Sequence, residues 1–244
     1  MAAIEEFTGF PKRAVTFLRD LAAHNDRDWF QARREEYEKS VLAPARAFVS
    51  AMGEQLRRLS PGIRFDPRTN GSLFRIFRDT RFSPDKSPYK TNLGIFFWEG
   101  RGPRMECSGY YFHLEPPTLM LGAGLYFFPR PLLERYRSAV ADPEYGDELA
   151  AIVKKVAALP GYSLGGEHYK RVPIPSSGTL EADHLADPAV AGLLRHDGLY
   201  SGWEGPIPAE LHSPALVEFC WQKFKPMKPL HRWLATLAAG GFDI

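Results

Sequence analysis

A run of basic, acidic and hydroxyl side chains between residues 75 and 92 is the part of the sequence best suited to chemistry. It holds five cations and two acids, a local surplus of three positive charges that exceeds the formal net charge of +2 of the whole chain. Guanidinium groups suit phosphate and carboxylate, and hydroxyls and loop N–H groups add donors. We therefore predict a pocket for an anionic, phosphate-bearing small molecule or nucleotide, bound by Arg75, Arg78, Arg81, Ser83, Lys86, Tyr89 and Lys90.

Three residues are candidates for acid–base catalysis. Asp79 and Asp85 could orient the neighbouring cations, or one of them could transfer a proton. Strand alternation places Tyr111, His113 and Glu115 on one face, so that His113 could act as a general base. A half-buried cross-strand histidine is the alternative interpretation. If the protein is an enzyme, preorganised cations would stabilise the negative charge that develops in the transition state. The sequence does not indicate a particular reaction or cofactor.

Two other functions compete with the anion pocket. One is a nucleic-acid-associated binding module that combines the charged loop with basic groups elsewhere, because bases interleaved with aromatic rings suit stacking on nucleotides. The other is a structural or interaction protein whose charged loop only pairs internally, as Arg78 with Asp79 and Asp85 with Lys86. The further basic groups are residues 169–173 and a C-terminal set of Lys223, Lys225, Lys228, His231 and Arg232 among Trp221, Phe224 and Trp233.

Several classes of site are not expected. The seven histidines are scattered without a His-Glu-x-x-His pattern, and the two cysteines, Cys107 and Cys220, form no pair, so no metal site is predicted. Gly122-x-Gly124 lacks the third glycine of a dinucleotide fingerprint. The paucity of cysteines favours a reducing compartment, and no apolar run reaches the roughly 20 residues of a membrane span. We expect a cytoplasmic protein without a membrane partner.

The charged run resembles the signature of a protein family. The motif Arg-Asp-Thr-Arg-Phe-Ser-x-Asp-Lys-Ser-Pro-Tyr-Lys-Thr-Asn begins at Arg78, residues 25–30 read Asn-Asp-Arg-Asp-Trp-Phe, and residues 109–114 read Gly-Tyr-Tyr-Phe-His-Leu. Together they resemble the domain of unknown function (DUF) 2461 family, conserved hypothetical proteins of bacteria and fungi. The resemblance runs from about Phe10 to the C-terminal helices and implies a single-domain protein with this loop as its signature. Pro84 stands where a lysine is expected, and the charged positions are kept.

The elements around these residues predict an α+β fold. The first sixty residues follow helical spacing, with Pro11 and Pro44 at helix starts and Asp26 as an N-cap. Aromatic and branched residues then predict strands, and their short connections predict a mainly antiparallel sheet of four or more strands, flanked by N-terminal and C-terminal helices. Residues 1–244 are interpreted as one domain. The expected strands are 72–78, 93–98, 109–115 and 118–127; later helices are expected at 129–141, 143–158, near 188–195 and within 214–239, with a short strand near 169–173.

The first expected strand carries a specific consequence for the site. Both faces of residues 72–78 mix arginine with large apolar side chains, so the strand is expected to be largely covered. Its guanidinium groups would then be partly desolvated and would need carboxylates, carbonyls or a bound anion.

Overall fold

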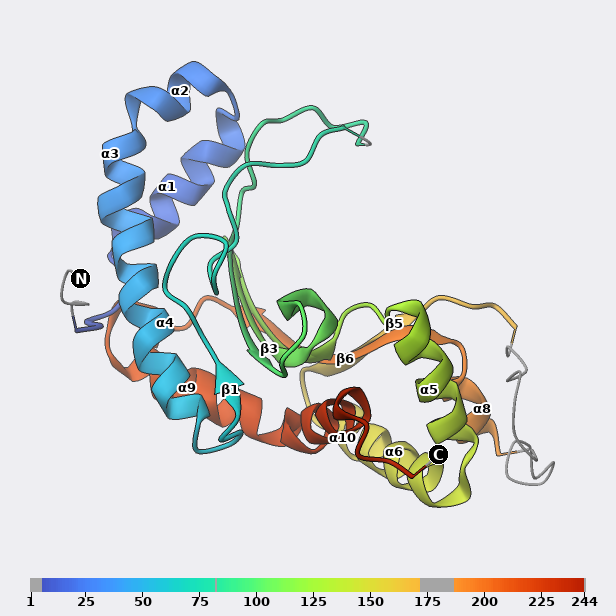
Figure 1. Ribbon diagram of the computed structural model, residues 1–244. Helices are drawn as coiled ribbons and strands as arrows, with labels where there is room; N and C mark the ends of the chain where they lie inside the picture. The colour runs from blue at the N-terminus through green and yellow to red at the C-terminus, as the bar shows by residue number, and fades with distance from the viewer. Residues whose placement is uncertain (1–5, 82, 172–186, 244) are drawn as a thin grey trace. The chain divides into compact units, whose positions relative to one another are not determined.

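The computed structural model describes residues 6–81, 83–171 and 187–243 (Figure 1). Six strands form an antiparallel sheet in the order β1-β2-β3-β4-β6-β5. This arrangement, with helices at both ends of the chain, confirms the α+β class. The strands are β1 (Ile63–Arg64), β2 (Leu93–Glu99), β3 (Ser108–Glu115), β4 (Thr118–Leu125), β5 (Tyr162–Glu167) and β6 (His196–Pro206).

The N-terminal helices begin and end where local chemistry favours it. The carboxylate of Asp26 accepts a hydrogen bond of 2.8 Å from the backbone N–H of Trp29 and so caps the second helix, as the sequence predicted. Pro44 lies in the first turn of the last N-terminal helix, Ala43–Leu56. The helices are α1 (Lys12–Ala23), α2 (Arg27–Ala32), α3 (Arg34–Tyr37), the π-helical turn η1 (Glu38–Leu42) and α4 (Ala43–Leu56).

The later helices also agree with the predicted ranges. Asp142 caps one of them by accepting from the backbone N–H groups of Glu144 and Tyr145. These helices are α5 (Arg130–Ala141), α6 (Pro143–Ala157), α8 (Pro188–Leu193), α9 (Ala215–Phe224) and α10 (Lys228–Ala239), with the short 3-10 turns η2 (Arg104–Glu106), η3 (Ala209–His212) and η4 (Lys225–Met227). Among the described residues, none of the helices is long and apolar enough to cross a bilayer.

The chain divides into two compact units. Unit 1 comprises residues 1–97, 111–121 and 204–223, and unit 2 comprises residues 98–110, 122–203 and 224–244. Each unit draws on three separate stretches of chain, and the interpretation of residues 1–244 as one domain stays a prediction.

Each unit has its own aromatic core. In unit 1, Phe112 of β3 is fully buried between Phe48 of α4, with ring centroids 4.9 Å apart, and Phe10, at 6.1 Å. In unit 2, Tyr136 of α5 stacks on Phe128 at 4.5 Å, and its buried hydroxyl donates to the carbonyl of Leu193. Burial raises the pKa of Tyr136 well above its usual value, so the hydroxyl keeps its proton and this hydrogen bond.

The predicted strand at residues 72–78 is not a regular strand. The structure shows isolated bridges here instead, antiparallel from Leu73 to Ile95 and from Phe77 to Tyr89 and parallel from Thr69 to Leu73. Hydrogen bonds from the Arg78 N–H to the Pro88 carbonyl and from the Lys90 N–H to the Ile76 carbonyl flank the second bridge. The ladder ends there because Pro88 has no N–H to donate.

The expected burial of the guanidinium groups was therefore wrong. Arg75, Arg78 and Arg81 are all exposed residues, because the chain around them is not covered as a central strand would be. Their charges are solvated or paired at the surface, and burial does not force them to bind an anion.

Two strands in the region 159–208 were missed. β5 and the eleven-residue β6 contain Gly165, Gly166, Gly198 and Gly202, which conceal the strand pattern. The predicted helix near 188–195 is confirmed as α8. Of the strand predicted at 169–173, residues 169–171 are not in a strand, and 172–173 lie outside the described residues.

Candidate functional site

Residues 75–81 and 83–92, here called the charged arm, are fixed to the N-terminal helices of unit 1 (Figure 1). The side-chain amide of Asn25 makes two hydrogen bonds to the backbone of Tyr89, donating to its carbonyl at 2.9 Å and accepting from its N–H at 3.0 Å. The Tyr89 ring stacks on Phe30 of α2 with centroids 4.2 Å apart and lies 5.4 Å from the ring of Phe77. These contacts hold the base of the charged arm beside α2.

A pocket of about 590 Å³ lies between the charged arm and the start of α2. Three of the residues that line it are cations, Arg27, Arg78 and Lys86, and one is an acid, Asp26. The lining residues therefore carry a surplus of positive charge, and the Asp26 carboxylate is engaged as the cap of α2. The other lining residues are Asn25, Gln31, Phe77, Thr80, Pro88 and Tyr89.

The two acids of the charged arm pair with arginines inside it. Arg81 makes a two-pronged contact with Asp79, at 3.0 Å and 2.8 Å, and Nη1 of Arg78 contacts Asp85. The hydrogen bond from Arg81 lowers the pKa of Asp79 to about 2, and hydrogen bonds from Ser87 and Arg78 lower that of Asp85. Both carboxylates are therefore ionised at neutral pH and poorly suited to donating a proton.

The predicted ligand-binding residues separate into two groups. Three of them, Arg78, Lys86 and Tyr89, line the pocket, whereas Arg75, Arg81, Ser83 and Lys90 do not. The ammonium of Lys90 instead lies 5.3 Å from the ring centroid of Phe74.

Sequence reasoning missed the contribution of the α2 start. Asn25, Arg27 and Gln31 line the same pocket. The signal was present in the Asn-Asp-Arg motif at residues 25–27, which resembled the family pattern but carried no recognisable chemistry of its own.

The second candidate group, around His113, is a closed hydrogen-bond cluster on one face of β3. Its Nδ1 lies 3.0 Å from the Tyr111 hydroxyl and 3.3 Å from Nδ2 of Asn92, while Nε2 lies 3.2 Å from a carboxylate oxygen of Glu115. The amide and the hydroxyl are donors toward Nδ1, so we assign the ring proton to Nε2. Thr91 donates to the other Glu115 oxygen at 2.6 Å and lowers the pKa of that carboxyl.

This cluster favours a structural role for His113. Burial, together with the charge of Glu115, raises the pKa of Tyr111 to about 12, so the hydroxyl remains a donor and occupies the free lone pair of the ring. The His113 side chain is 23% exposed, and it does not line the pocket described above. Its role as a general base stays a prediction.

A third cluster, in unit 2, was not expected from the sequence. His231 is fully buried, with Nδ1 2.9 Å from the Ser108 hydroxyl and Nε2 2.8 Å from a carboxylate oxygen of Glu99. The residue types are those of a hydrolase triad, but Ser108 is itself fully buried and so inaccessible to a substrate. Phe224 and Trp233 are buried as well, which removes these two rings and His231 from any surface that could stack on nucleotides.

The remaining titratable groups add no metal or thiol site. Across residues 6–81, 83–171 and 187–243, no group of three or more His, Cys, Asp and Glu side chains is placed to hold a metal ion. Cys107 and Cys220 are free and buried, and burial raises the pKa of the Cys220 thiol. A thiol in such surroundings is inert.

Comparison with known proteins gives the chain its family. No curated protein matches it. The family model described as "Conserved hypothetical protein (DUF2461)" matches residues 13–233, which include both the start of α2 and the charged arm. The chain therefore belongs to the DUF2461 family.

Proposed function

We propose that unit 1 binds an anionic, phosphate-bearing small molecule, preferably a nucleotide, in the pocket between α2 and the charged arm. The observation that carries this proposal is the lining itself, in which three cations outnumber the one carboxylate, that of Asp26, which caps α2. A phosphate in this pocket would meet positive charge from two separate segments of the chain.

Each of the three cations keeps donors for a ligand. In the described part of the chain, no carboxylate lies within ion-pairing distance of Arg27. Asp85 contacts Arg78 at Nη1, which leaves most of the five N–H donors of that guanidinium. Lys86 donates to the Thr80 carbonyl at 2.9 Å and has two further N–H donors.

An exposed ring favours a nucleotide over a bare phosphate. Phe77 is 52% exposed although it lines the pocket, and Tyr89 supports its ring from one side. Stacking of a base on such a ring is worth roughly 1–3 kcal/mol. A ligand that joins a planar base to a phosphate would use both the ring and the cations.

The nucleic-acid module is the weaker alternative. Its stacking surface would need aromatic rings in the C-terminal basic segment, but Phe224 and Trp233 are buried, and Trp221 is half-buried with the Arg58 guanidinium 5.2 Å from its ring centroid. A steep fall of affinity with salt would favour many phosphate contacts, whereas one bound nucleotide gives a shallow fall.

Internal pairing is the stronger alternative. Arg81 with Asp79 and Arg78 with Asp85 are the kind of pairs that a purely structural loop would make. Against this alternative, Arg27 and Lys86 bring charge to the pocket that these two pairs do not neutralise.

Calorimetric titration with adenosine monophosphate, adenosine and inorganic phosphate tests the proposal. We expect the monophosphate to bind more tightly than either fragment. Arg27→Ala and Arg78→Ala should each weaken it about tenfold or more, because each removes a charge-assisted hydrogen bond. Phe77→Ala should weaken it about fivefold or more by removing the stacking platform.

Arg19→Ala is the matched control, since Arg19 is an exposed arginine of α1 that does not line the pocket. Equal effects of the Arg19, Arg27 and Arg78 variants would refute the proposal, as would saturable binding of adenosine alone at the affinity of its phosphate.

We also propose a cytoplasmic location. Two free, buried thiols and no disulfide among the described residues agree with a reducing compartment. Fractionation of cells that express the chain at its native level would place it, and recovery outside the cytoplasm would overturn this proposal.

A further inference from the structure

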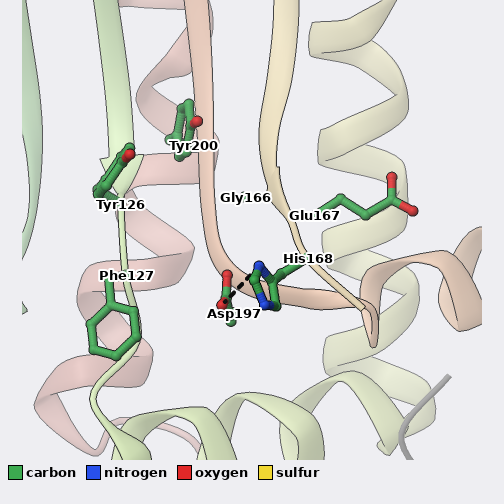
Figure 2. Close-up of a pocket in the computed structure, with 7 residues that line it drawn as sticks. All are labelled: Tyr126, Phe127, Gly166, Glu167, His168, Asp197 and Tyr200. Carbon is green, nitrogen blue, oxygen red and sulfur yellow. Dashed lines mark ion pairs between the residues drawn. The ribbon is translucent and has the colours of Figure 1, made fainter. Parts of the chain in front are cut away.

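Unit 2 contains a second pocket, of about 310 Å³, which shares no residue with the first (Figure 2). The residues around it come from the end of β4, from the end of β5 and from the start of β6. They are Tyr126, Phe127, Gly166, Glu167, His168, Asp197 and Tyr200.

Glycines allow the strands to approach closely around this pocket. The register between β5 and β6 shifts between Gly165 and Glu167, and Gly166 there has φ of +98°. A Cβ at Gly166 would lie 2.0 Å from the Gly198 carbonyl oxygen, and one at Gly198 would lie 2.1 Å from the Tyr126 carbonyl oxygen. β-bulges of this kind re-aim side chains and are over-represented beside active sites.

The aromatic side chains of the pocket are held open to solvent. Tyr126 is 72% exposed and Phe127 is 56% exposed, which is unusual for such large apolar groups. The ring of Tyr126 stacks on that of Tyr200, with centroids 5.5 Å apart and an angle of 29° between the planes. The faces of these rings carry negative potential and attract cations.

The pocket that these rings line also contains the carboxylate of Asp197. The Asp197 side chain is 26% exposed and lies 3.7 Å from Nδ1 of His168. The other carboxylate, that of Glu167, pairs with Arg195 at 2.9 Å, and its side chain points away from the tyrosines in Figure 2. Among the residues that the structure describes, no lysine or arginine lines the pocket.

We propose that this pocket binds a planar organic cation with N–H donors, a guanidinium or an amidinium group. Its plane would stack on Tyr126 or Tyr200, and its paired N–H groups would donate to both oxygens of Asp197. An anion would meet a carboxylate and no permanent cation. A quaternary ammonium group would gain the attraction of the rings but could not donate to Asp197.

Ligand-observed NMR titration with benzamidinium tests this proposal in the full chain. Benzamide is the matched ligand, because it has nearly the same shape without the charge, and tetramethylammonium is the cation without N–H donors. We expect saturable benzamidinium binding with a dissociation constant on the order of 1 mM, and weaker binding of both controls.

Three variants locate the binding. Asp197→Asn should weaken benzamidinium binding about tenfold or more, because the charged partner of the ligand is lost. The backbone carbonyl of residue 197, which accepts a hydrogen bond from the Phe128 N–H, is unchanged in this variant. Tyr126→Ala should weaken benzamidinium binding about twofold to fivefold, and because Tyr126 is 72% exposed its truncation removes no core packing. Glu148→Gln, which removes an exposed acid of α6 outside the pocket, should change nothing.

The remaining outcomes would overturn the proposal. These are the absence of saturable benzamidinium binding, equal affinity for benzamide, and an unchanged dissociation constant in Asp197→Asn. Arg27→Ala should leave benzamidinium binding intact, so failure of this proposal can be told apart from failure of the nucleotide proposal.

Discussion

The pockets of the two units differ in charge and in how they are built. The unit 1 pocket lies against an arm whose arginines pair with acids close in sequence, and its lining is cationic. The unit 2 pocket is built on glycine contacts between strands, and its lining combines aromatic rings with carboxylates. A dense charged segment therefore reveals the first pocket in the sequence, whereas the second depends on backbone geometry and leaves no local motif.

The largest expected effect tests the glycine contacts of the unit 2 pocket. Gly166→Ala places a Cβ 2.0 Å from a backbone oxygen at a positive φ, and we expect a loss of about 3 kcal/mol or more in the free energy of unfolding. Denaturant unfolding measures this loss, and benzamidinium titration reports the pocket. Gly192→Ala is the control, because nothing lies within 4 Å of its added Cβ and alanine favours the helix α8. Equal stability of the two variants would contradict the close approach.

The next effect tests how the charged arm is fixed in unit 1. Asn25→Ala removes both hydrogen bonds to Tyr89, and we expect a loss of about 1–3 kcal/mol of stability together with weaker binding of adenosine monophosphate. Gln31→Ala, at the same pocket, should leave stability unchanged. If both variants unfold at the same denaturant concentration as the parent, the arm does not depend on Asn25.

The fold was largely predictable because local patterns determine it. Asp26 and Asp142 were readable as helix boundaries, and β2, β3 and β4 follow aromatic and branched residues. β6 was missed because Gly198 and Gly202 lower its apparent strand propensity, and their role becomes visible only in contacts with other strands.

The unit 1 site was predictable in part, because local sequence patterns mark some of its residues. Arg78, Lys86 and Tyr89 lie in one dense segment and were identified, whereas Arg27 reaches the pocket from α2, about fifty residues away in sequence. The burial expected for Arg75 depended on a regular strand, whereas the chain forms only isolated bridges on either side of this residue, at Leu73 and Phe77. Charge density thus indicates where a site is, and tertiary contacts decide which charges belong to it.

A smaller effect separates binding from internal pairing in the charged arm. Arg81 is 76% exposed and does not line the pocket, so Arg81→Ala should lower the free energy of unfolding by no more than the roughly 0–1 kcal/mol of an exposed ion pair, and it should leave the affinity for adenosine monophosphate unchanged. Arg78→Ala is the matched comparison and should weaken the binding of adenosine monophosphate. A sharp fall in melting temperature in both variants, with no ligand that stabilises the parent, would support the structural alternative instead.

The smallest effect is a shift in a single titration. The pKa of Asp79 is lowered to about 2 from its usual 3.8, chiefly by the hydrogen bond from Arg81. Because the folded value is depressed, the pair stabilises the arm above pH 3.8, and this contribution is lost as the pH falls through about 2. Carboxyl NMR shifts should therefore show Asp79 titrating near 2 in the parent and at a higher pH in Arg81→Ala, where the side-chain hydrogen bond is lost. An ordinary titration in the parent would mean that Arg81 is not held by Asp79, and the contrast between the self-paired acids of the arm and Asp197 of unit 2, whose ion-pair partner is a histidine, would lose its basis.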